Sequence, residues 1–410
     1  MVPQPAPADT EYRSLPSVKA EQPSVDMRRI SLIGMGHFTN DLYGNLATSL
    51  APYFVLAGKL SAPAAGALVL VYLSGSSILQ PLFGIISDRS GRRWFAVVGP
   101  AWIGCCMCPL VLAPQAWQIF VLVAVGGIGT AAFHPQGASM VNRLAGKNRG
   151  HAMAVFSTGG NVGYALGPLL ALILFQVHGS WALVATIPGF VISSLLFRYA
   201  PTVKSAAMET AGKSLRDARA NFGPLARIVL VIAIRSGAMS AVIFLSPLAF
   251  HQQGLPAQWG SIGSTIFLLV GAAFGLYAGR LSDRVGRKPV VVWSLVAAAP
   301  LIFLIGILPG LASWPVMALA GAAIVASNAV TVVQAQELLP GNVGLAAGLT
   351  LGLGFGLSGV VTLAVSAITR EAGARETLMM AAALPILAAG LAATMRSRPK
   401  LGLPAAGLSS

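Results

Sequence analysis

The chain has 410 residues, of which 55% are hydrophobic and only 10% are charged. A soluble domain carries roughly 25% charged residues, so this composition excludes an ordinary soluble protein and indicates a membrane protein. The formal net charge of +15 would suit a nucleic-acid partner, but the positions of the basic residues argue against one.

Residues 1–27 are rich in proline, serine and charge, which predicts a short disordered tail without a cleavable signal peptide. Beyond it, apolar stretches long enough to cross about 30 Å of hydrocarbon recur along the chain. Twelve membrane spans are predicted, at residues 30–57, 63–87, 94–112, 116–140, 149–176, 181–200, 224–250, 258–281, 289–308, 313–336, 343–369 and 377–395.

The basic residues fall almost entirely on one side of these spans. Only Lys59, Arg370 and Arg375 lie on the other side. Because cytoplasmic loops carry the excess of lysine and arginine, we expect both termini to be cytoplasmic, in a bacterial inner membrane. The positive charge then reflects topology and not a nucleic-acid partner. We expect a monomer that meets a small-molecule substrate, protons and membrane lipids.

A charged motif occurs twice, 195 residues apart, and each copy joins two apolar runs. The glycines permit a tight turn, and each aspartate stands near several arginines with which it can pair. The two copies are candidate gating elements; the alternative is that they only anchor the topology. The first copy contains Gly84, Asp88, Arg89, Gly91 and Arg92, and the second contains Gly279, Asp283, Arg284, Gly286 and Arg287.

The repeat predicts an all-α membrane protein with two pseudo-symmetric six-helix bundles and a substrate site between them. Its parts are a bundle at 28–200, a cytoplasmic linker at 201–222, a second bundle at 223–396 and a cytoplasmic tail at 397–410. Glycines spaced by four occur in the fifth and eleventh spans, and such spacing lets helices pack closely. Either they serve packing alone, or these two spans meet across the seam between the halves. These glycines are Gly159, Gly163 and Gly167, and Gly348, Gly352 and Gly356.

The repeated hairpin, the twelve spans and the central linker resemble the major facilitator superfamily, from Arg28 to Met395. The segments His37-Phe-Thr-Asn40-Asp41-Leu-Tyr43 and Phe133-His134-Pro135-Gln136-Gly137 resemble its fosmidomycin-resistance branch. The resemblance implies that spans 1, 4, 7 and 10 line a central cavity. It also implies that Asp88 helps to hold the outward-open state by docking onto the eleventh span.

Two full charges lie deep in the predicted spans, Asp41 and Arg235, and they are 194 residues apart, at equivalent places in the repeat. Each costs roughly 2.5–3.5 kcal/mol at the bilayer centre on insertion scales, so each needs a function. His37 lies one turn before Asp41, and histidine titrates near neutral pH. We expect Asp41, helped by His37, to bind and release the driving proton. The alternative is a polar network that only fixes the first helix.

Other polar residues of the cavity spans are candidate substrate contacts. His134 precedes Pro135, which opens the helix, and its repeat mate is Asn328. Alternatively, His134 only caps the broken helix, and Glu337 is a solvated residue at a helix end. With Arg235, which would attract an anion, the predicted substrate residues are His134, Asn40, Tyr43, Asn45, Gln136, Asn328 and Gln334.

Several patterns are missing. The fourth span has Val123 where drug antiporters usually carry an arginine, and Ala171-Leu172 replaces the last two glycines of an exporter motif, so the sequence indicates direction only in part. No nucleotide-binding loop, metal-ligand spacing or catalytic triad is found, and we expect no enzyme, metal or cofactor. Cys105, Cys106 and Cys108 are interpreted as small apolar residues rather than a soft-metal site.

Together these features predict proton-coupled efflux, by alternating access, of a small polar or anionic organic compound such as an antibiotic or toxic metabolite. The first alternative is proton-coupled uptake of a small carboxylate nutrient. The second is a membrane sensor or assembly factor that transports nothing.

Overall fold

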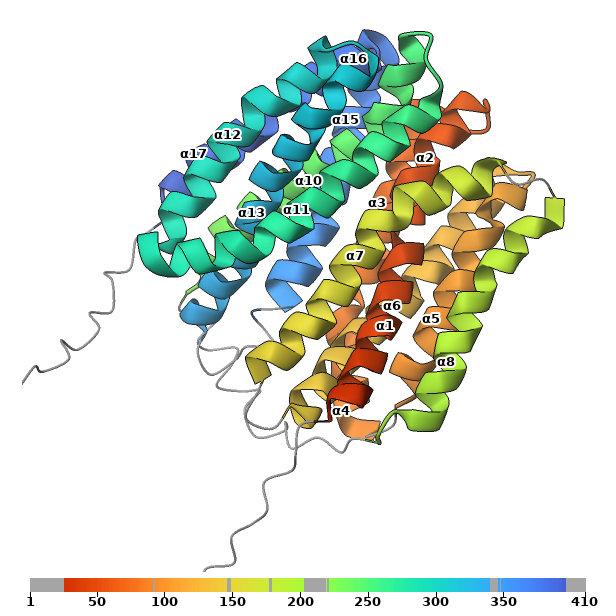
Figure 1. Cartoon of the computed structure of the whole chain (residues 1–410), viewed down its shortest axis with the longest axis vertical. Coiled ribbons are helices and arrows are strands. Elements are labelled where there is room, and N and C mark those ends of the chain that lie inside the picture. Colours follow the sequence, from red (N-terminus) through yellow and green to blue (C-terminus); the bar gives the residue numbers. More distant parts are fainter. Residues whose placement is uncertain are drawn as a thin grey trace, which may run out of the picture.

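The computed structural model describes residues 26–90, 93–145, 149–176, 179–202, 219, 221–339, 346 and 348–395. Within these ranges the chain is helical and contains no strand. Figure 1 shows the helices of the first half, coloured red to light green, packed beside those of the second half, coloured green to blue. The predicted all-α architecture is confirmed.

The first half contains ten helical segments. In chain order they are α1 (Met27–Gly44), α2 (Leu46–Leu56), α3 (Ala62–Ile78), α4 (Gln80–Ser90), α5 (Trp94–Met107), η1 (Cys108–Leu112), α6 (Ala116–Leu144), α7 (Arg149–Gln176), η2 (Gly179–Thr186) and α8 (Ile187–Tyr199).

The second half repeats the pattern with nine segments among the described residues. They are α10 (Phe222–Gln252), α11 (Ala257–Val285), α12 (Arg287–Ile307), η4 (Gly310–Ala312), α13 (Ser313–Leu338), the π-helix η5 (Gly348–Gly354), α15 (Phe355–Ala372), α16 (Ala374–Ala381) and α17 (Ala383–Ala393).

In the described part of the chain, 11 helical stretches are long and apolar enough to cross a membrane, beginning with Ala62–Gly84. The predicted first span, residues 30–57, is covered by α1 and α2 and is not among these 11 stretches. In Figure 1, α1 and α2 follow one another through the first half. Asn45 separates them, and α1 is less apolar than the other spans because it contains Arg28, Arg29, His37 and Asp41. The described chain thus has 11 or, with α1 and α2, 12 candidate membrane-spanning stretches, and the least apolar of them carries the polar residues.

The hairpin turn of the second half confirms that its glycine permits a tight turn. Gly286 joins α11 to α12 with φ +101°, a value that glycine adopts at little cost. In the first half, Gly91 and Arg92 lie outside the described residues, and the side chains of Asp88 and Arg89 do as well.

Helix α7 packs directly on the backbone of α1. A Cβ atom added at Gly163 would lie 2.0 Å from the carbonyl oxygen of Phe38, and one at Gly159 would lie 2.3 Å from that of Gly34. In the second half, Gly352 and Gly356 face α3, and a Cβ at Gly356 would lie 3.1 Å from the Cβ of Ser77, whereas nothing lies within 4 Å of a Cβ at Gly348. The alternative in which the two glycine-rich helices pack mainly on each other is not the one observed: their main close-packed partners are α1 and α3.

The halves meet along three pairs of helices, α3 with α15, α7 with α11, and α2 with α10. At the end of the bundle remote from the start of α1, two hydrogen bonds cross this seam. The hydroxyls of Tyr53 and Ser261 are 2.6 Å apart, and the Gln176 amide donates to Gln258 over 3.0 Å. The two halves are thus fastened to one another at this end.

Candidate functional site

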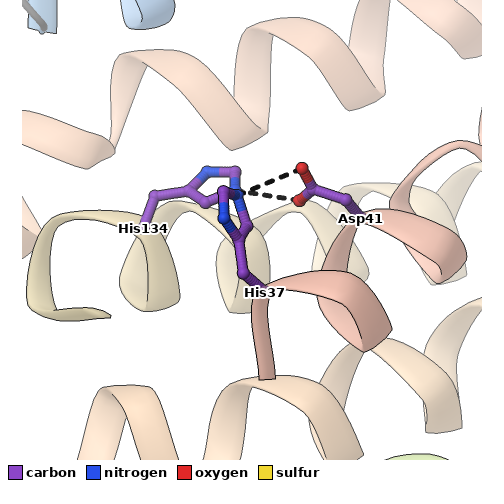
Figure 2. A group of neighbouring side chains, drawn as sticks. All are labelled: His37, Asp41 and His134. Carbon is purple, nitrogen blue, oxygen red and sulfur yellow. Dashed lines mark hydrogen bonds and ion pairs between the residues drawn. The ribbon is translucent and has the colours of Figure 1, made fainter. Parts of the chain in front are cut away.

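Three side chains from two helices of the first half form a compact cluster, the histidine–aspartate cluster. His37 and Asp41 lie one turn apart on α1, and His134 comes from α6, just before Pro135. The Asp41 carboxylate lies between the two rings: Oδ1 is 2.9 Å from Nε2 of His134, and Oδ2 is 3.2 Å from Nε2 of His37 (Figure 2).

The hydrogen bonds around His37 define where its protons are. Nδ1 is 2.9 Å from the Phe156 carbonyl oxygen, and a carbonyl only accepts, so Nδ1 must carry a hydrogen. In a neutral His37, Nε2 would then direct a lone pair at the Asp41 carboxylate. A bond at that contact needs one more proton, held by His37 or by Asp41. The geometry therefore defines a site for one shared proton.

His134 differs, since it needs no extra proton. Its Nδ1 is 3.5 Å from the Gln80 amide nitrogen, which is a donor, so Nδ1 accepts. A neutral His134 then donates from Nε2 to Asp41. The Asn40 amide adds a second donor to the same carboxylate oxygen over 3.1 Å. Asp41 Oδ1 thus faces two donors, whereas Oδ2 contacts His37 alone among the described residues.

The rings of the cluster are held by close packing. The His37 ring stacks on Phe156 with centroids 4.1 Å apart and meets His134 edge-on at 5.0 Å. On the other side, a Cβ added at Gly160 would lie 2.4 Å from His37 Cε1. The side chains of His37, Asp41 and His134 nevertheless keep 13%, 19% and 26% of their surface exposed. Water-sized space therefore adjoins the cluster in the middle of the bundle.

In the described chain, this cluster is the one group of His, Cys, Asp and Glu that could hold a metal ion, with ligand atoms within 4.8 Å of one another. Neighbouring ligand atoms around a tetrahedral zinc ion with bonds of about 2.0–2.1 Å would be roughly 3.3 Å apart. The 2.9 Å contact between His134 and Asp41 is shorter and is that of a direct hydrogen bond. The arrangement therefore fits a proton better than a metal ion.

The second charged residue of the membrane interior, Arg235 on α10, is fully buried. Its Nη2 donates to Ser236 Oγ over 2.9 Å and to Asn328 Oδ1 over 3.2 Å. The Phe355 ring, at the start of α15, lies over the guanidinium at 5.7 Å. Nε and Nη1 are buried and have no partner in the described structure, and no carboxylate there pairs with this arginine. Arg235 therefore has unused capacity to bind an anion.

Asp41 and Arg235, the negative and the positive pole of the bundle, occupy equivalent places in the repeat. Asp41 bonds His134, and Arg235 bonds Asn328; each pair joins residues 93 positions apart. The first pair links α1 to α6, and the second links the corresponding helices α10 and α13. The duplication thus places a negative pole in one half and a positive pole in the other.

Other predicted substrate residues are bonded inside the first half. The Tyr43 hydroxyl donates to the Ala185 carbonyl over 2.6 Å, and the Asn45 amide donates to the Tyr164 carbonyl over 2.7 Å. Gln136 Oε1 accepts from the Ala96 backbone amide over 2.6 Å. These groups tie neighbouring helices together. Gln334, on α13, is half-buried, and its buried Oε1 has no partner in the described chain.

At the hairpins, a Cβ added at Gly84 would contact only Pro135, at 3.7 Å. In the second half, Arg287 pairs with Asp283 over 2.5 Å and with Glu337 over 3.3 Å. Glu337 is thus ion-paired to the hairpin rather than only solvated. Arg284 is exposed at the end of α11.

Three contributors were not predicted: Phe156, Tyr164 and Gln80. Phe156 and Tyr164 lie four residues on either side of Gly160, and they line up with His37 and Asp41 along α1. The signal that could have found Phe156 and Tyr164 is the glycine ladder of α7, which brings that face against the polar face of α1.

The chain belongs to the major facilitator superfamily, whose family model matches residues 33–362. It is 31% identical over 369 residues to the uncharacterized MFS-type transporter YfnC of Bacillus subtilis, covering 87% of this chain and 90% of that protein. It is 25% identical over 366 residues to the fosmidomycin resistance protein of Escherichia coli, with the same coverage of 87% and 90%.

Solved structures share the fold. The crystal structure of a D-xylose–proton symporter matches with a TM-score of 0.70 at 17% identity, over 91% of this chain and 98% of that one. The chain is therefore an integral membrane protein of a transporter family, and the predicted resemblance to the fosmidomycin-resistance branch is confirmed.

Proposed function

We propose that this protein exports a small polar or anionic organic compound in exchange for protons, by alternating access of a site between its two halves. The observation that carries the proposal is the pair of opposite charges at equivalent positions. Asp41 Oδ2 lies 3.2 Å from His37 Nε2 in one half, a contact that one shared proton would turn into a hydrogen bond, and Arg235 keeps two unpaired buried nitrogens in the other.

The proton acts at the contact between His37 Nε2 and Asp41 Oδ2. With the proton bound, this contact is a hydrogen bond between the two groups. Without the proton, the Nε2 lone pair of His37 faces the Asp41 carboxylate, and this contact is unfavourable in a poorly solvated site. Because His134 and Asn40 hold the other carboxylate oxygen in place, loss of the proton changes charge at one atom and leaves the carboxylate oriented.

The cargo binds at Arg235. A guanidinium without a counter-ion is costly to bury, and an anionic group would supply the missing hydrogen bonds. The Phe355 ring covers Arg235 in this conformation, so the cargo reaches it after a movement of the second half. An antibiotic or toxic metabolite is the proposed cargo, supported by the similarity to a fosmidomycin resistance protein.

The two hairpins are the proposed gates, and the charge distribution supports a bacterial inner membrane with both termini in the cytoplasm. In the second half, the pairing of Arg287 with Asp283 and Glu337 fastens α11 to α13 at the hairpin. In a gate of this kind, the ion pairs would break and re-form with other partners when the two halves move relative to each other.

The test uses Escherichia coli cells that lack their own fosmidomycin resistance protein and express this chain. We expect lower accumulation of labelled fosmidomycin than in empty cells, and an uncoupler should abolish the difference. Asp41→Asn should behave like empty cells, whereas Glu371→Gln, at an exposed carboxylate of α15, should match the wild type.

Equal export by Asp41→Asn at equal expression would remove the proton role. Higher accumulation in expressing cells would show uptake, which is the alternative direction. If neither fosmidomycin nor any member of an antibiotic panel is accumulated differently, the proposed export of such compounds is wrong.

A further inference from the structure

Two arginines without a carboxylate partner lie where α5 begins and α8 ends. Arg93 directly precedes α5, and its Nη1 donates to the carbonyl of Ala200, the residue that follows α8. Arg198 lies in the last turn of α8 and is exposed. Among the described side chains, neither guanidinium forms an ion pair. A guanidinium has five N–H donors, so the bond that caps α8 leaves most of Arg93 available to a ligand.

Aromatic rings surround these two guanidinium groups. The central carbon of the Arg93 guanidinium lies 5.4 Å from the centre of the Phe197 ring, and that of Arg198 lies 5.7 Å from the centre of the Tyr199 ring. The Trp94 ring joins the group, with its centroid 5.8 Å from that of Phe197. The three aromatic residues are 49–53% exposed. Tryptophan and tyrosine gather where a membrane meets water, so this end of α5 and α8 lies at the level of the lipid headgroups.

The surface of α8 that continues from these rings is apolar and faces outward. Only 22% of the apolar stretch in this span is buried, against 39–89% in the other ten spans of the described chain. Figure 1 shows α8 at the outer edge of the first half, beside α5. Phe190 and Phe197 are exposed and two helical turns apart, and so are Val191 and Arg198. An exposed apolar stripe therefore leads to Arg198, and a second leads to the ring that Arg93 covers.

We propose that Arg93 and Arg198 bind the headgroup of one anionic phospholipid, whose acyl chains lie along the exposed face of α8. Both arginines are anchored on the last turn of that helix, since Arg93 contacts Phe197 and Ala200, which flank Arg198 and Tyr199 in the chain. Guanidinium groups bind phosphate through paired hydrogen bonds, and basic residues at the membrane surface attract anionic lipids.

The chemistry of the site selects among the possible occupants. A zwitterionic headgroup carries a cation in addition to its phosphate, and the described site offers no carboxylate to receive it. Free phosphate would gain nothing from the apolar stripes of α8, whereas acyl chains cover them. An anionic phospholipid satisfies both the charge and the apolar surface. The proposal depends neither on the cargo nor on the direction of transport.

The experiment measures lipid binding to the purified full-length chain in a non-ionic detergent by native mass spectrometry. Phosphatidylglycerol and phosphatidylcholine with identical acyl chains are titrated separately, and the Kd of the first bound lipid is compared. We expect phosphatidylglycerol to bind at least tenfold more tightly. Glycerol 3-phosphate, which has the phosphate without the acyl chains, should not displace it even in large excess.

A double variant, Arg93→Gln with Arg198→Gln, should bind phosphatidylglycerol about thirtyfold more weakly, because each arginine near an anionic headgroup contributes roughly fivefold. The matched control is Arg143→Gln with Arg227→Gln. These arginines are also exposed near helix ends, and neither lies over an aromatic ring of the described chain. The control removes the same charge and should keep the wild-type Kd.

Two single variants complete the test. Arg198→Gln removes no hydrogen bond of the described structure, so it should fold normally and weaken binding about fivefold. Phe197→Leu removes the ring beneath Arg93 and should weaken binding about two- to fivefold, as expected for an exposed cation–π contact.

The proposal is overturned if phosphatidylcholine binds as tightly as phosphatidylglycerol or if Arg198→Gln and the Arg93–Arg198 double variant keep the wild-type Kd. It is also overturned if the control double variant loses as much affinity, which would show attraction by net charge alone. Displacement by glycerol 3-phosphate would show a site for free phosphate instead of a lipid.

Discussion

Substituting Gly163 by alanine tests whether the contact of α7 with α1 positions the proton site. An added Cβ would lie 2.0 Å from the Phe38 carbonyl oxygen, whereas ordinary contact begins at about 3.4 Å. The helices must therefore separate locally by about 1.4 Å. The His37–Phe156 hydrogen bond, now 2.9 Å, spans the same two helices and would lengthen to roughly 4 Å, beyond hydrogen-bond range.

Two consequences follow for Gly163→Ala. Overpacking of this size costs about 1–3 kcal/mol, so the thermal midpoint in detergent should fall by several degrees. Proton-driven transport should fall further, because loss of the Phe156 bond frees Nδ1 and lets His37 adopt either tautomer. Gly390→Ala is the control, since nothing lies within 4 Å of its added Cβ. A Gly163→Ala protein with wild-type thermal midpoint and transport would refute the reasoning.

Three further predictions concern the charges and the seam. Arg235→Gln should abolish export while raising the thermal midpoint, because it removes a buried charge with two unpaired nitrogens; a lower midpoint would contradict this. Tyr53→Phe removes the bond to Ser261 across the seam, worth about 0.5–1.5 kcal/mol; it should increase labelling of a cysteine introduced between α2 and α11 in a background without Cys105, Cys106 and Cys108, and unchanged labelling would count against it. Asp88→Asn should insert normally but transport more slowly, and wild-type rates at equal expression would remove its gating role.

The sequence predicts much of this fold because lipid imposes simple rules. Each span must be apolar and helical over a fixed length, so the predicted span at 94–112 coincides with an observed helical stretch and the one at 149–176 coincides with α7. The repeat also predicts the equivalence of Asp41 with Arg235. The structure shows the same equivalence in the two matching hydrogen bonds to His134 and Asn328.

Side-chain direction and helix partners could not be predicted in the same way. Tyr43 lies on α1 with Asp41, and Asn45 directly follows that helix, yet the Tyr43 hydroxyl bonds the segment before α8 and the Asn45 amide bonds α7. The rotation of a polar helix depends on which neighbour packs against which face, and periodicity alone does not specify that. The same reason applies to the partners of the glycine-rich helices, since a small-residue stripe indicates close packing but not its partner.

The central claim is that Asp41 exchanges the driving proton while Arg235 and its surroundings bind cargo. The most direct measurement compares two modes of fosmidomycin transport by Asp41→Asn in proteoliposomes. We predict that proton-driven net flux is lost while exchange of labelled for unlabelled fosmidomycin, which needs no proton, continues. Proton-driven net flux that persists in Asp41→Asn with the wild-type pH dependence would contradict the claim.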